Sequence, residues 1–283
     1  MLPSHTQKLI SERDAQIKFV SGSHSYYING KKTSTSVTGL IEKFFNPFNP
    51  REVAATMIAR DDFYDEERYA KYWPILEPFD KPLSKEDTEK IIDIITASWE
   101  ENGSGASQAG TNMHESIEDF YTHGKQLPDT NESKHFLAFH KYAISLGYRP
   151  LRSEQILWDA DLNIAGCADM LYIPTDTPKD VIATYKPKVW LVDWKRSKKI
   201  SKHGYGKYGT GLCSHKKDCN FEHYSLQLNI YKFLLQKNYG LEVVRMTLVI
   251  LHPDQKTFDK FEVTDDQELV ARIFADVSSS EVK

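Results

Sequence analysis

Hydrophobic and polar residues alternate along positions 18–36, and an Asn29-Gly30 pair divides the alternating run. A period of two is typical of a half-buried strand, and Asn-Gly is a pair that tight hairpin turns prefer. The pattern therefore predicts that a small β-hairpin opens the chain. From residue 37 onward the spacing of the apolar residues becomes helical.

Two capping signals mark the first helices. Ser36 or Thr38 can be the N-cap of a helix that starts at Val37, because a side-chain oxygen there accepts a hydrogen bond from a free backbone amide. Asn49 and Pro50 combine a cap with proline at the first helical position. Glycines, or the segment ENGSG, end the later helices. The later helices are expected over about 84–99, 106–123, 132–146, 224–239 and from 265 onward.

Short β-prone runs dominate the second half of the chain. The turn-like segment DADLN separates the first two runs, which therefore predict a hairpin, and the third run returns beside them. The runs are SEQILWD (153–159), IAGCADMLYI (164–173), VWLVDWKR (189–196), VVRMTLVIL (243–251) and KFEVT (260–264). Helices and strands in this order indicate an α/β fold. We expect an N-terminal hairpin and helical layer, 1–104, that packs on a core formed by 105–283.

The composition is that of a globular protein, with 40% hydrophobic and 27% charged residues in a chain of 283. No run is apolar enough for a transmembrane helix, and the N-terminal residues do not resemble a signal peptide. The three cysteines are too few, and odd in number, for a disulfide framework. We therefore expect an intracellular protein, of unknown compartment, that does not bind membranes.

The distribution of charge is uneven. A net charge of −4 argues against a protein that coats nucleic acid through a global positive field. Residues 193–208 nevertheless hold six basic residues and one acid. Such a basic strip suits an enzyme that holds a phosphate backbone at one place, and a solvated lysine-rich loop is the alternative. The expected nucleic-acid contacts are Ser36, Thr38, Arg196, Ser197, Lys198, Lys199, Lys202 and Lys207.

Candidate chemistry is concentrated on two strands. Asp169 lies in the middle of an apolar run, and Asp193 and Lys195 are two residues apart, so these two share one face of their strand. Buried charges cost desolvation energy unless they are paired or bind a metal, and carboxylate oxygens suit Mg²⁺ or Mn²⁺. The alternative is a satisfied salt bridge between Asp193 and Lys195, which is the more frequent meaning of an isolated D-x-K.

Polar residues on two predicted helices accompany these strands. His114 and Glu118 are four residues apart and share the face that must also contact the core, and Gln227 and Tyr231 do the same on a later helix. Polar groups at such positions need partners. Glu154 begins the first strand, where it can reach the same end of the sheet as the two aspartates.

Five motifs follow one another in a recognisable order. They are G-x-x-x-H (110–114), Glu154 on a strand, G-x-x-D (166–169), D-W-K (193–195) and Q-x-x-x-Y (227–231). Over about 106–252 the chain resembles the RecB branch of the PD-(D/E)XK nucleases, which includes the mitochondrial genome maintenance exonuclease and the CRISPR adaptation nucleases. The resemblance implies a restriction-endonuclease-like mixed sheet flanked by helices.

The resemblance also implies a divalent-metal site. His114, Asp169 and Asp193 would bind the metal, with the Trp194 carbonyl as a further ligand. Glu154 would hold a second metal or a metal-bound water. The metal, Mg²⁺ or Mn²⁺, would lower the pKa of the attacking water and neutralise the leaving oxygen.

The remaining matched residues would act on the substrate. Lys195 would orient or activate the water and offset charge in the transition state. Gln227 and Tyr231 match the helix that contacts the scissile strand. Glu118 has no firm counterpart, and we assign it a supporting position behind the ligands.

The implied function is a DNA nuclease, most simply an exonuclease or flap-trimming enzyme on single strands or free ends. The alternatives are a catalytically silent nucleic-acid-binding protein, a structure-specific endonuclease on the same fold, and a hydrolase of another phosphodiester. Aromatic residues of the N-terminal part could stack on unpaired bases, although core packing explains most of them more simply. They are Tyr26, Tyr27, Tyr64, Trp73 and Trp99.

Two cofactors are not expected. Iron–sulfur members of the RecB branch supply four cysteines, and this chain has three. A short segment offers residue types that could bind Zn²⁺, but its spacing differs from that of a standard finger, so a packed loop is favoured. Those residues are Cys213, His215, Cys219 and His223. The neighbouring glycines 204, 206 and 209 match G-x-G-x-x-G without the strand and helix of a dinucleotide site, and we expect a flexible loop there.

Overall fold

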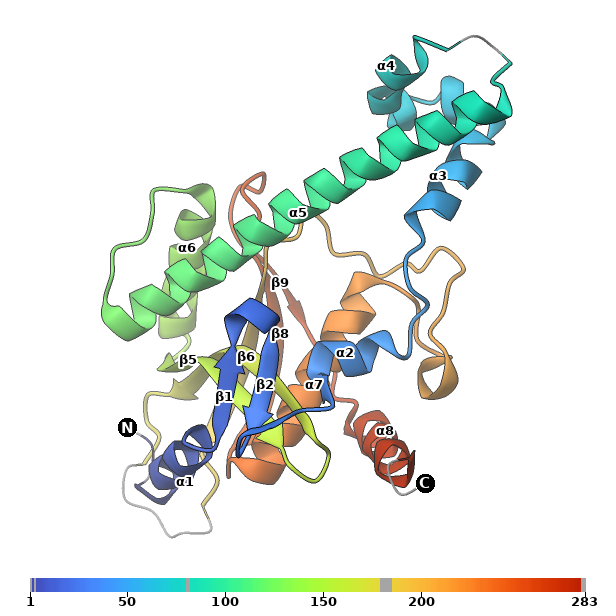
Figure 1. The fold of residues 1–283 in the computed structure, drawn as a ribbon. Coiled ribbons are helices and arrows are strands. Elements are labelled where there is room, and N and C mark those ends of the chain that lie inside the picture. The colour runs from blue at the N-terminus through green and yellow to red at the C-terminus, as the bar shows by residue number, and fades with distance from the viewer. Residues whose placement is uncertain (1, 3, 80–81, 179–184, 281–283) are drawn as a thin grey trace. The chain divides into compact units, whose positions relative to one another are not determined.

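The computed structural model describes residues 2, 4–79, 82–178 and 185–280 (Figure 1). Its contacts form two compact units. We call Met1–Asn46 together with Asn112–Lys283 the sheet unit, and Pro47–Thr111 the helical unit. The N-terminal hairpin lies in the sheet unit, because its residues Tyr26 and Ile28 share a hydrophobic cluster with the central strands. This division differs from the expected one at residue 104.

The sheet unit contains a six-stranded mixed sheet and a separate three-stranded antiparallel sheet. The small sheet consists of β1 (Ile17–Val20), β2 (Ser25–Ile28) and β3 (Lys31–Lys32). The strands of the large sheet are β4 (Thr35–Ser36), β5 (Tyr148–Asp159), β6 (Ile164–Pro174), β7 (Lys188–Lys195), β8 (Glu242–Ile250) and β9 (Asp259–Glu262). Strands β5, β6 and β7 are antiparallel neighbours, β8 runs parallel to β7, and β9 is antiparallel to β8. The predicted mixed α/β fold is confirmed.

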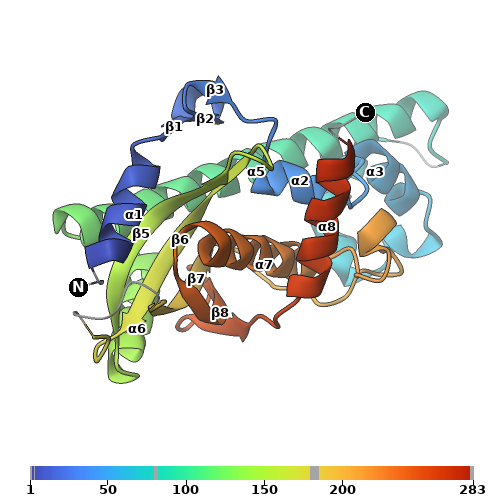
Figure 2. The same cartoon turned by 90° about the horizontal axis from the view of Figure 1, so that it is seen from below.

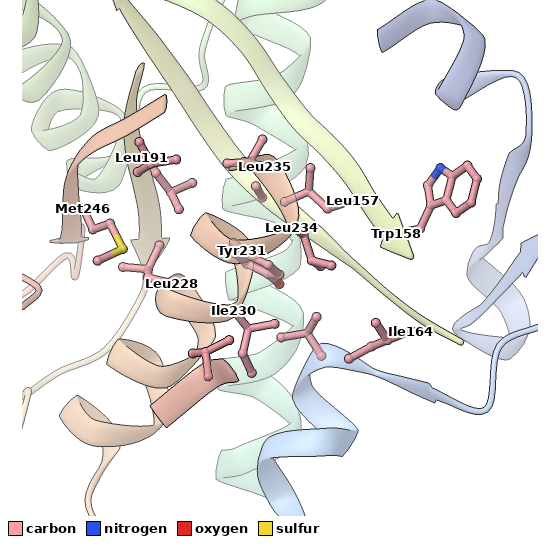
Figure 3. Packing of buried hydrophobic residues seen from close by; sticks show 14 of the residues in the cluster. Leu157, Trp158, Ile164, Leu191, Leu228, Ile230, Tyr231, Leu234, Leu235 and Met246 are labelled. Carbon is pink, nitrogen blue, oxygen red and sulfur yellow. The ribbon is translucent and has the colours of Figure 1, made fainter. Parts of the chain in front are cut away.

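Helices cover both faces of the large sheet (Figures 1 and 2). The helices of the sheet unit are α1 (Ser4–Asp14), α2 (Val37–Glu42), α6 (Asn131–Ser145), α7 (Asn220–Asn238) and α8 (Gln267–Ser280), with single 3-10 turns at Ser21–Ser23 and Gly211–Cys213. On one face, α7 packs Leu228, Leu234 and Leu235 into the cluster that holds Leu157 and Leu191 of the sheet (Figure 3). This face therefore forms the larger core.

The opposite face of the sheet packs against α6 and the C-terminal part of α5 (Lys85–His123). Alternation along β7 separates the two cores, since Val189 and Leu191 join the α7 side while Trp190 and Val192 join the α6 side. A sheet that is buried on both faces explains why the strands are nearly continuous apolar runs.

The helical unit has a core of its own. Its elements are α3 (Pro50–Ile58), α4 (Trp73–Leu76), 3-10 helices at Asp61–Tyr64 and Glu67–Tyr72, and the N-terminal part of α5. Phe63, Ile91 and Ile95 are fully buried at its centre. Among the described residues of the chain, none of the helices combines the length and the apolar character needed to cross a bilayer.

The local capping predictions are confirmed. The Ser36 hydroxyl accepts a hydrogen bond from the Gly39 amide at 3.0 Å, and Asn49 caps α3 in front of Pro50. Asn29 and Gly30, both with positive φ, form the turn between β2 and β3. Each of these features depends on neighbouring residues alone, which is why the sequence predicts them.

The prediction of two helices at 84–99 and 106–123 is wrong, because α5 is one continuous helix. Gly103 and Gly105 lie inside it. A glycine weakens a helix by about 1 kcal/mol. Helix extension is cooperative, however, so stable helical turns on both sides of Gly103 and Gly105 keep the helix continuous through them. Helix α1 was not expected, since its apolar residues are too sparse to show a helical period, and it precedes the hairpin that was expected to open the chain.

Replacing Gly103 and Gly105 together by alanine should stabilise α5. Alanine favours a helix by up to about 1 kcal/mol per position, and a Cβ at either site would meet no atom of the described residues within 4 Å. The midpoint of thermal unfolding should rise. Gly240→Ala is the matched control, because φ is +62° there and alanine should lower the midpoint. A double variant that unfolds below the wild-type temperature would contradict a continuous α5.

Candidate metal centre

Strands β6 and β7 separate at two aspartates. Their last paired residues are Met170 and Val192, and one further step of this register would place Asp169 opposite Asp193. The Trp194 amide instead donates a hydrogen bond to Asp169 Oδ2 at 2.7 Å. The Asp169 carboxylate thus replaces the backbone carbonyl that a neighbouring strand usually supplies as acceptor. The pairing of β6 and β7 therefore ends at Asp169 and Asp193.

Glu154 approaches Asp169 from the other neighbouring strand. Ser153 pairs with Met170 and Gln155 with Ala168, so Glu154 lies opposite Asp169 on β5. Its φ of +45° is in the left-handed region, which side-chain-bearing residues seldom occupy. Such local irregularities in strands often redirect a side chain next to a functional site.

His114 joins the carboxylates from α5. Its Nδ1 atom lies 3.4 Å from Glu154 Oε1 and 3.7 Å from Asp169 Oδ1. Its Nε2 atom lies 3.1 Å from the Trp194 carbonyl oxygen. Burial alone would lower the pKa of His114, but the charges of Asp169 and Glu154 raise it to about 9. Without a metal, the imidazole is therefore a cation between two carboxylates and a carbonyl.

Asp193 and Lys195 form a buried ion pair beside this group. Lys195 Nζ lies 2.6 Å from Asp193 Oδ2, and the Asp193 side chain is 1% exposed. Burial raises the pKa of Asp193 to about 7, against the opposing charge of Lys195. Burial would lower the pKa of Lys195, but Asp193 and Asp169 raise it. Asp193 Oδ1 has no hydrogen-bond partner among the described residues, so one buried oxygen is left to accept a further bond.

The ligand-type atoms are close enough to share one cation. One atom each of His114, Glu154 and Asp169 lies within 4.8 Å of the others. Ligands at about 2.1 Å from Mg²⁺ lie roughly 3 to 4 Å apart, so this group needs only a small contraction. It contains Glu154 rather than Asp193, which was expected as a ligand and here faces Lys195. An imidazole with two carboxylates suits Mn²⁺ or Mg²⁺.

Helix α7 carries Tyr231 and Gln227, two of the predicted site residues. Tyr231 is buried, and its hydroxyl accepts a hydrogen bond from the Gln227 amide at 3.0 Å. Gly166 makes room for this tyrosine, since a Cβ there would lie 2.8 Å from Tyr231 Cε1 and 2.9 Å from Val37 Cγ2. The glycine of the G-x-x-D motif is therefore explained by packing.

Cys167 is a member of the centre that the motifs do not include. Its thiol donates a hydrogen bond to Glu154 Oε2 at 3.2 Å, while Oε1 of the same carboxylate faces His114. Burial raises the pKa of Cys167 well above its ordinary value, so the thiol keeps its proton. Its position two residues before Asp169 on a strand was the available signal, because it places both side chains on one face.

The other predicted residues occupy different environments. Burial and the charge of Glu154 raise the pKa of Glu118. Arg196 forms a half-buried ion pair with Glu132 at 2.8 Å, and the Ser36 hydroxyl caps α2. Thr38, Lys198, Lys199, Lys202 and Lys207 are exposed, and Ser197 is half-buried.

The cysteine and histidine residues between 213 and 223 lie before α7 and in its first turn. Cys213 and Cys219 are buried free thiols. His223 lies against the Phe45 ring, with centroids 3.9 Å apart, and its Nε2 atom lies 3.0 Å from Asp218 Oδ1. His215 is exposed. His223 is therefore engaged by Phe45 and Asp218.

No family model matches the chain, and no curated protein matches it. Among solved structures, the chain is similar to one described as the crystal structure of SSO0001, with 14% identical residues and a TM-score of 0.31. That similarity covers 98% of this chain and 85% of the other. A TM-score this low is no basis for inferring a shared activity. A functional inference for this protein therefore rests on the arrangement of its own side chains.

Cys167→Ala should weaken binding of Mn²⁺ by about tenfold, because it removes the donor that orients Glu154. Cys167→Ser retains a hydrogen-bond donor and should bind within a factor of about two of wild type. Isothermal titration calorimetry measures both, and thermal unfolding reports whether each variant is folded. Equal affinities for wild type and Cys167→Ala would show that the thiol does not position the carboxylate.

Proposed function

We propose that this protein is a divalent-metal-dependent nuclease that hydrolyses phosphodiester bonds in DNA. The observation that carries the proposal is the group formed by His114, Glu154 and Asp169 beside the buried pair of Asp193 and Lys195. Two carboxylates and an imidazole converge from three separate elements on one point. Buried charges brought together in this way are frequent at catalytic sites.

The residues of the centre have distinct roles in the proposal. His114, Glu154 and Asp169 would hold Mg²⁺ or Mn²⁺, which supplies charge neutralisation and a more acidic water. Lys195 would orient that water and offset negative charge in the transition state, since its raised pKa keeps it cationic. Asp193 holds the ammonium at 2.6 Å and has an oxygen free to accept a hydrogen bond.

The exposed lysines after β7 support a nucleic-acid substrate. Lys198, Lys199, Lys202 and Lys207 are all exposed, and they follow Lys195 directly in the chain. Their charges can contact phosphates on either side of the scissile bond. We propose single strands or free ends as the substrate, acted on by exonucleolytic or flap-trimming cleavage, because within the described part of the chain the centre adjoins no element typical of base-specific readout.

A catalytically silent nucleic-acid-binding protein is the second candidate. The ion pair between Lys195 and Asp193 favours it, because each charge already has a partner at 2.6 Å. The pair belongs to an interior strand rather than to a sheet edge, and Asp169 lies beside it. With Glu154 and His114 included, three carboxylates face two cations, so one negative charge is uncompensated unless a further cation is bound, which favours the metal-dependent enzyme.

End-labelled single- and double-stranded DNA should be cleaved in the presence of Mg²⁺ or Mn²⁺ and left intact in EDTA. Lys195→Ala and Asp193→Asn should each lower the rate by about 100-fold or more, because a charge that acts in the transition state is lost. Gel electrophoresis of the products measures the rates.

Lys237→Ala is the matched control for this experiment. Lys237 forms an ion pair of the same kind with the buried Asp159 at 2.7 Å, at a place that the proposal does not use. Its removal should leave the cleavage rate unchanged after correction for folded protein. Wild type that leaves every substrate intact with both metals, while it still binds DNA, would support the silent protein instead.

Binding of Mn²⁺ should strengthen as the pH rises. A metal ligand must be neutral imidazole, whereas the pKa of His114 is raised to about 9. The metal must therefore displace one proton below that pH, and its apparent affinity should increase about tenfold per pH unit between about 6 and 8. Calorimetry in two buffers of different ionisation enthalpy measures the released proton. An affinity that does not change with pH would exclude His114 as a ligand.

A further inference from the structure

The segment between β7 and α7 carries two exposed tyrosines among basic residues. Tyr205 is 87% exposed and Tyr208 is 50% exposed, which are high values for large aromatic side chains. Lys207 and Lys217 lie beside them and are also exposed. All four residues line one open cavity of about 310 Å³, together with His203 and two glycines.

Backbone hydrogen bonds connect the parts of this segment, for which a flexible loop was expected. The Lys207 amide donates to the Gly204 carbonyl at 2.8 Å, and the Asp218 amide donates to the Lys207 carbonyl at 3.0 Å. Tyr208 and Lys217 form an antiparallel bridge. A Cβ on Gly204 would lie 2.4 Å from the Lys207 carbonyl oxygen and 3.0 Å from the Asp218 amide nitrogen. The chain around Gly204 therefore packs directly on the chain around Asp218.

Tyr205 stands at the tip of the turn in an unfavourable backbone conformation. Its φ is +48°, and that of Gly206 is +82°. Glycine, asparagine and aspartate are the usual residues at such a position, because a larger side chain strains the left-handed region. Backbone strain of this kind indicates a function for the side chain.

The segment is joined to the elements of the metal centre. It begins shortly after Lys195 at the end of β7 and ends where α7 starts, and α7 carries Tyr231. The Ser201 amide donates to Asn220 Oδ1 at 2.8 Å, and the Thr210 amide donates to the Phe44 carbonyl at 2.7 Å. A ligand held by this turn therefore lies on the same unit as the proposed catalytic residues.

We propose that Tyr205 and Tyr208 form a stacking platform for the unpaired bases of single-stranded DNA, with Lys207 and Lys217 as contacts for its phosphates. The inference rests on the proposed nuclease function and names the residues that would hold its single-stranded substrate. An aromatic ring stacks on any base, so this platform accepts all sequences. In a duplex the faces of the bases are covered by their neighbours, so the same surface discriminates against double strands.

Tyr205→Gly tests the proposal most sharply. Glycine suits the left-handed backbone, so this variant should unfold at a higher temperature than wild type and yet bind single-stranded DNA at least about tenfold more weakly. Tyr208→Ala should weaken binding to a similar degree, whereas Tyr205→Phe retains the ring and should bind like wild type. Fluorescence anisotropy with a labelled oligothymidine in EDTA measures binding without cleavage.

Two comparisons separate stacking from charge. Lys207→Ala should flatten the salt dependence of binding, whereas Tyr205→Gly should leave its slope unchanged because no charge is removed. A labelled hairpin duplex should bind the tyrosine variants and wild type with equal affinity. Phe48→Ala, which removes another exposed aromatic ring, is the control for nonspecific effects and should change neither affinity.

The failure of this inference differs from that of the proposed function. Wild-type affinity of both tyrosine variants for single strands, equal losses on single and double strands, or no binding by wild type would each overturn the stacking platform. Hydrolysis of bis(4-nitrophenyl) phosphate with Mn²⁺ reports on the metal centre without requiring a base. If this hydrolysis is observed together with any of those results, the proposed nuclease function is retained. If neither this compound nor DNA is hydrolysed, the proposed nuclease function is refuted.

Discussion

The balance of charge at the opening between β6 and β7 is the constraint on which the rest of the structure depends. Glu154, Asp169 and Asp193 contribute three carboxylates, and His114 and Lys195 contribute two cations, on side chains that are buried or half-buried. Unpaired charge in such surroundings is costly. The raised pKa values of Asp193 and His114 both show the environment reducing net negative charge by retaining protons. A bound divalent cation would also reduce the net negative charge, and its binding would release those protons.

Every layer of the sheet unit contributes to that balance. Helix α5 supplies His114 from the side of the sheet that α6 covers, and α7 supplies Tyr231 from the opposite side. The strands between them are buried on both faces, so their backbone cannot shift to relieve a misplaced charge. Gly166 shows how tight the fit is, because even a methyl group there would overlap Tyr231 and Val37. The rigidity that the proposed chemistry would need comes from the two cores.

How far the sequence predicts this structure depends on the range of the interaction involved. The Asn29-Gly30 turn and the Ser36 cap are local features, and they were predicted correctly. The continuity of α5 was not, because whether a glycine ends a helix depends on the strength of the turns around it. The convergence of His114 on Asp169 was expected only through a family resemblance, since no local pattern relates a helix to a strand more than fifty positions away.

Contacts between side chains of different elements were the hardest features to predict from the sequence. Cys167 donates to Glu154 across two strands, and Arg196, counted among the basic residues, is occupied by Glu132. Pairings of this kind depend on tertiary contacts alone.

The left-handed backbone of Glu154 also limits which residues can replace it. Glycine or asparagine would suit the main chain but lack a carboxylate, and aspartate would suit the main chain and keep a carboxylate on a shorter side chain. Replacing Glu154 by glycine would therefore relieve the backbone strain and, under the proposed function, remove a metal ligand.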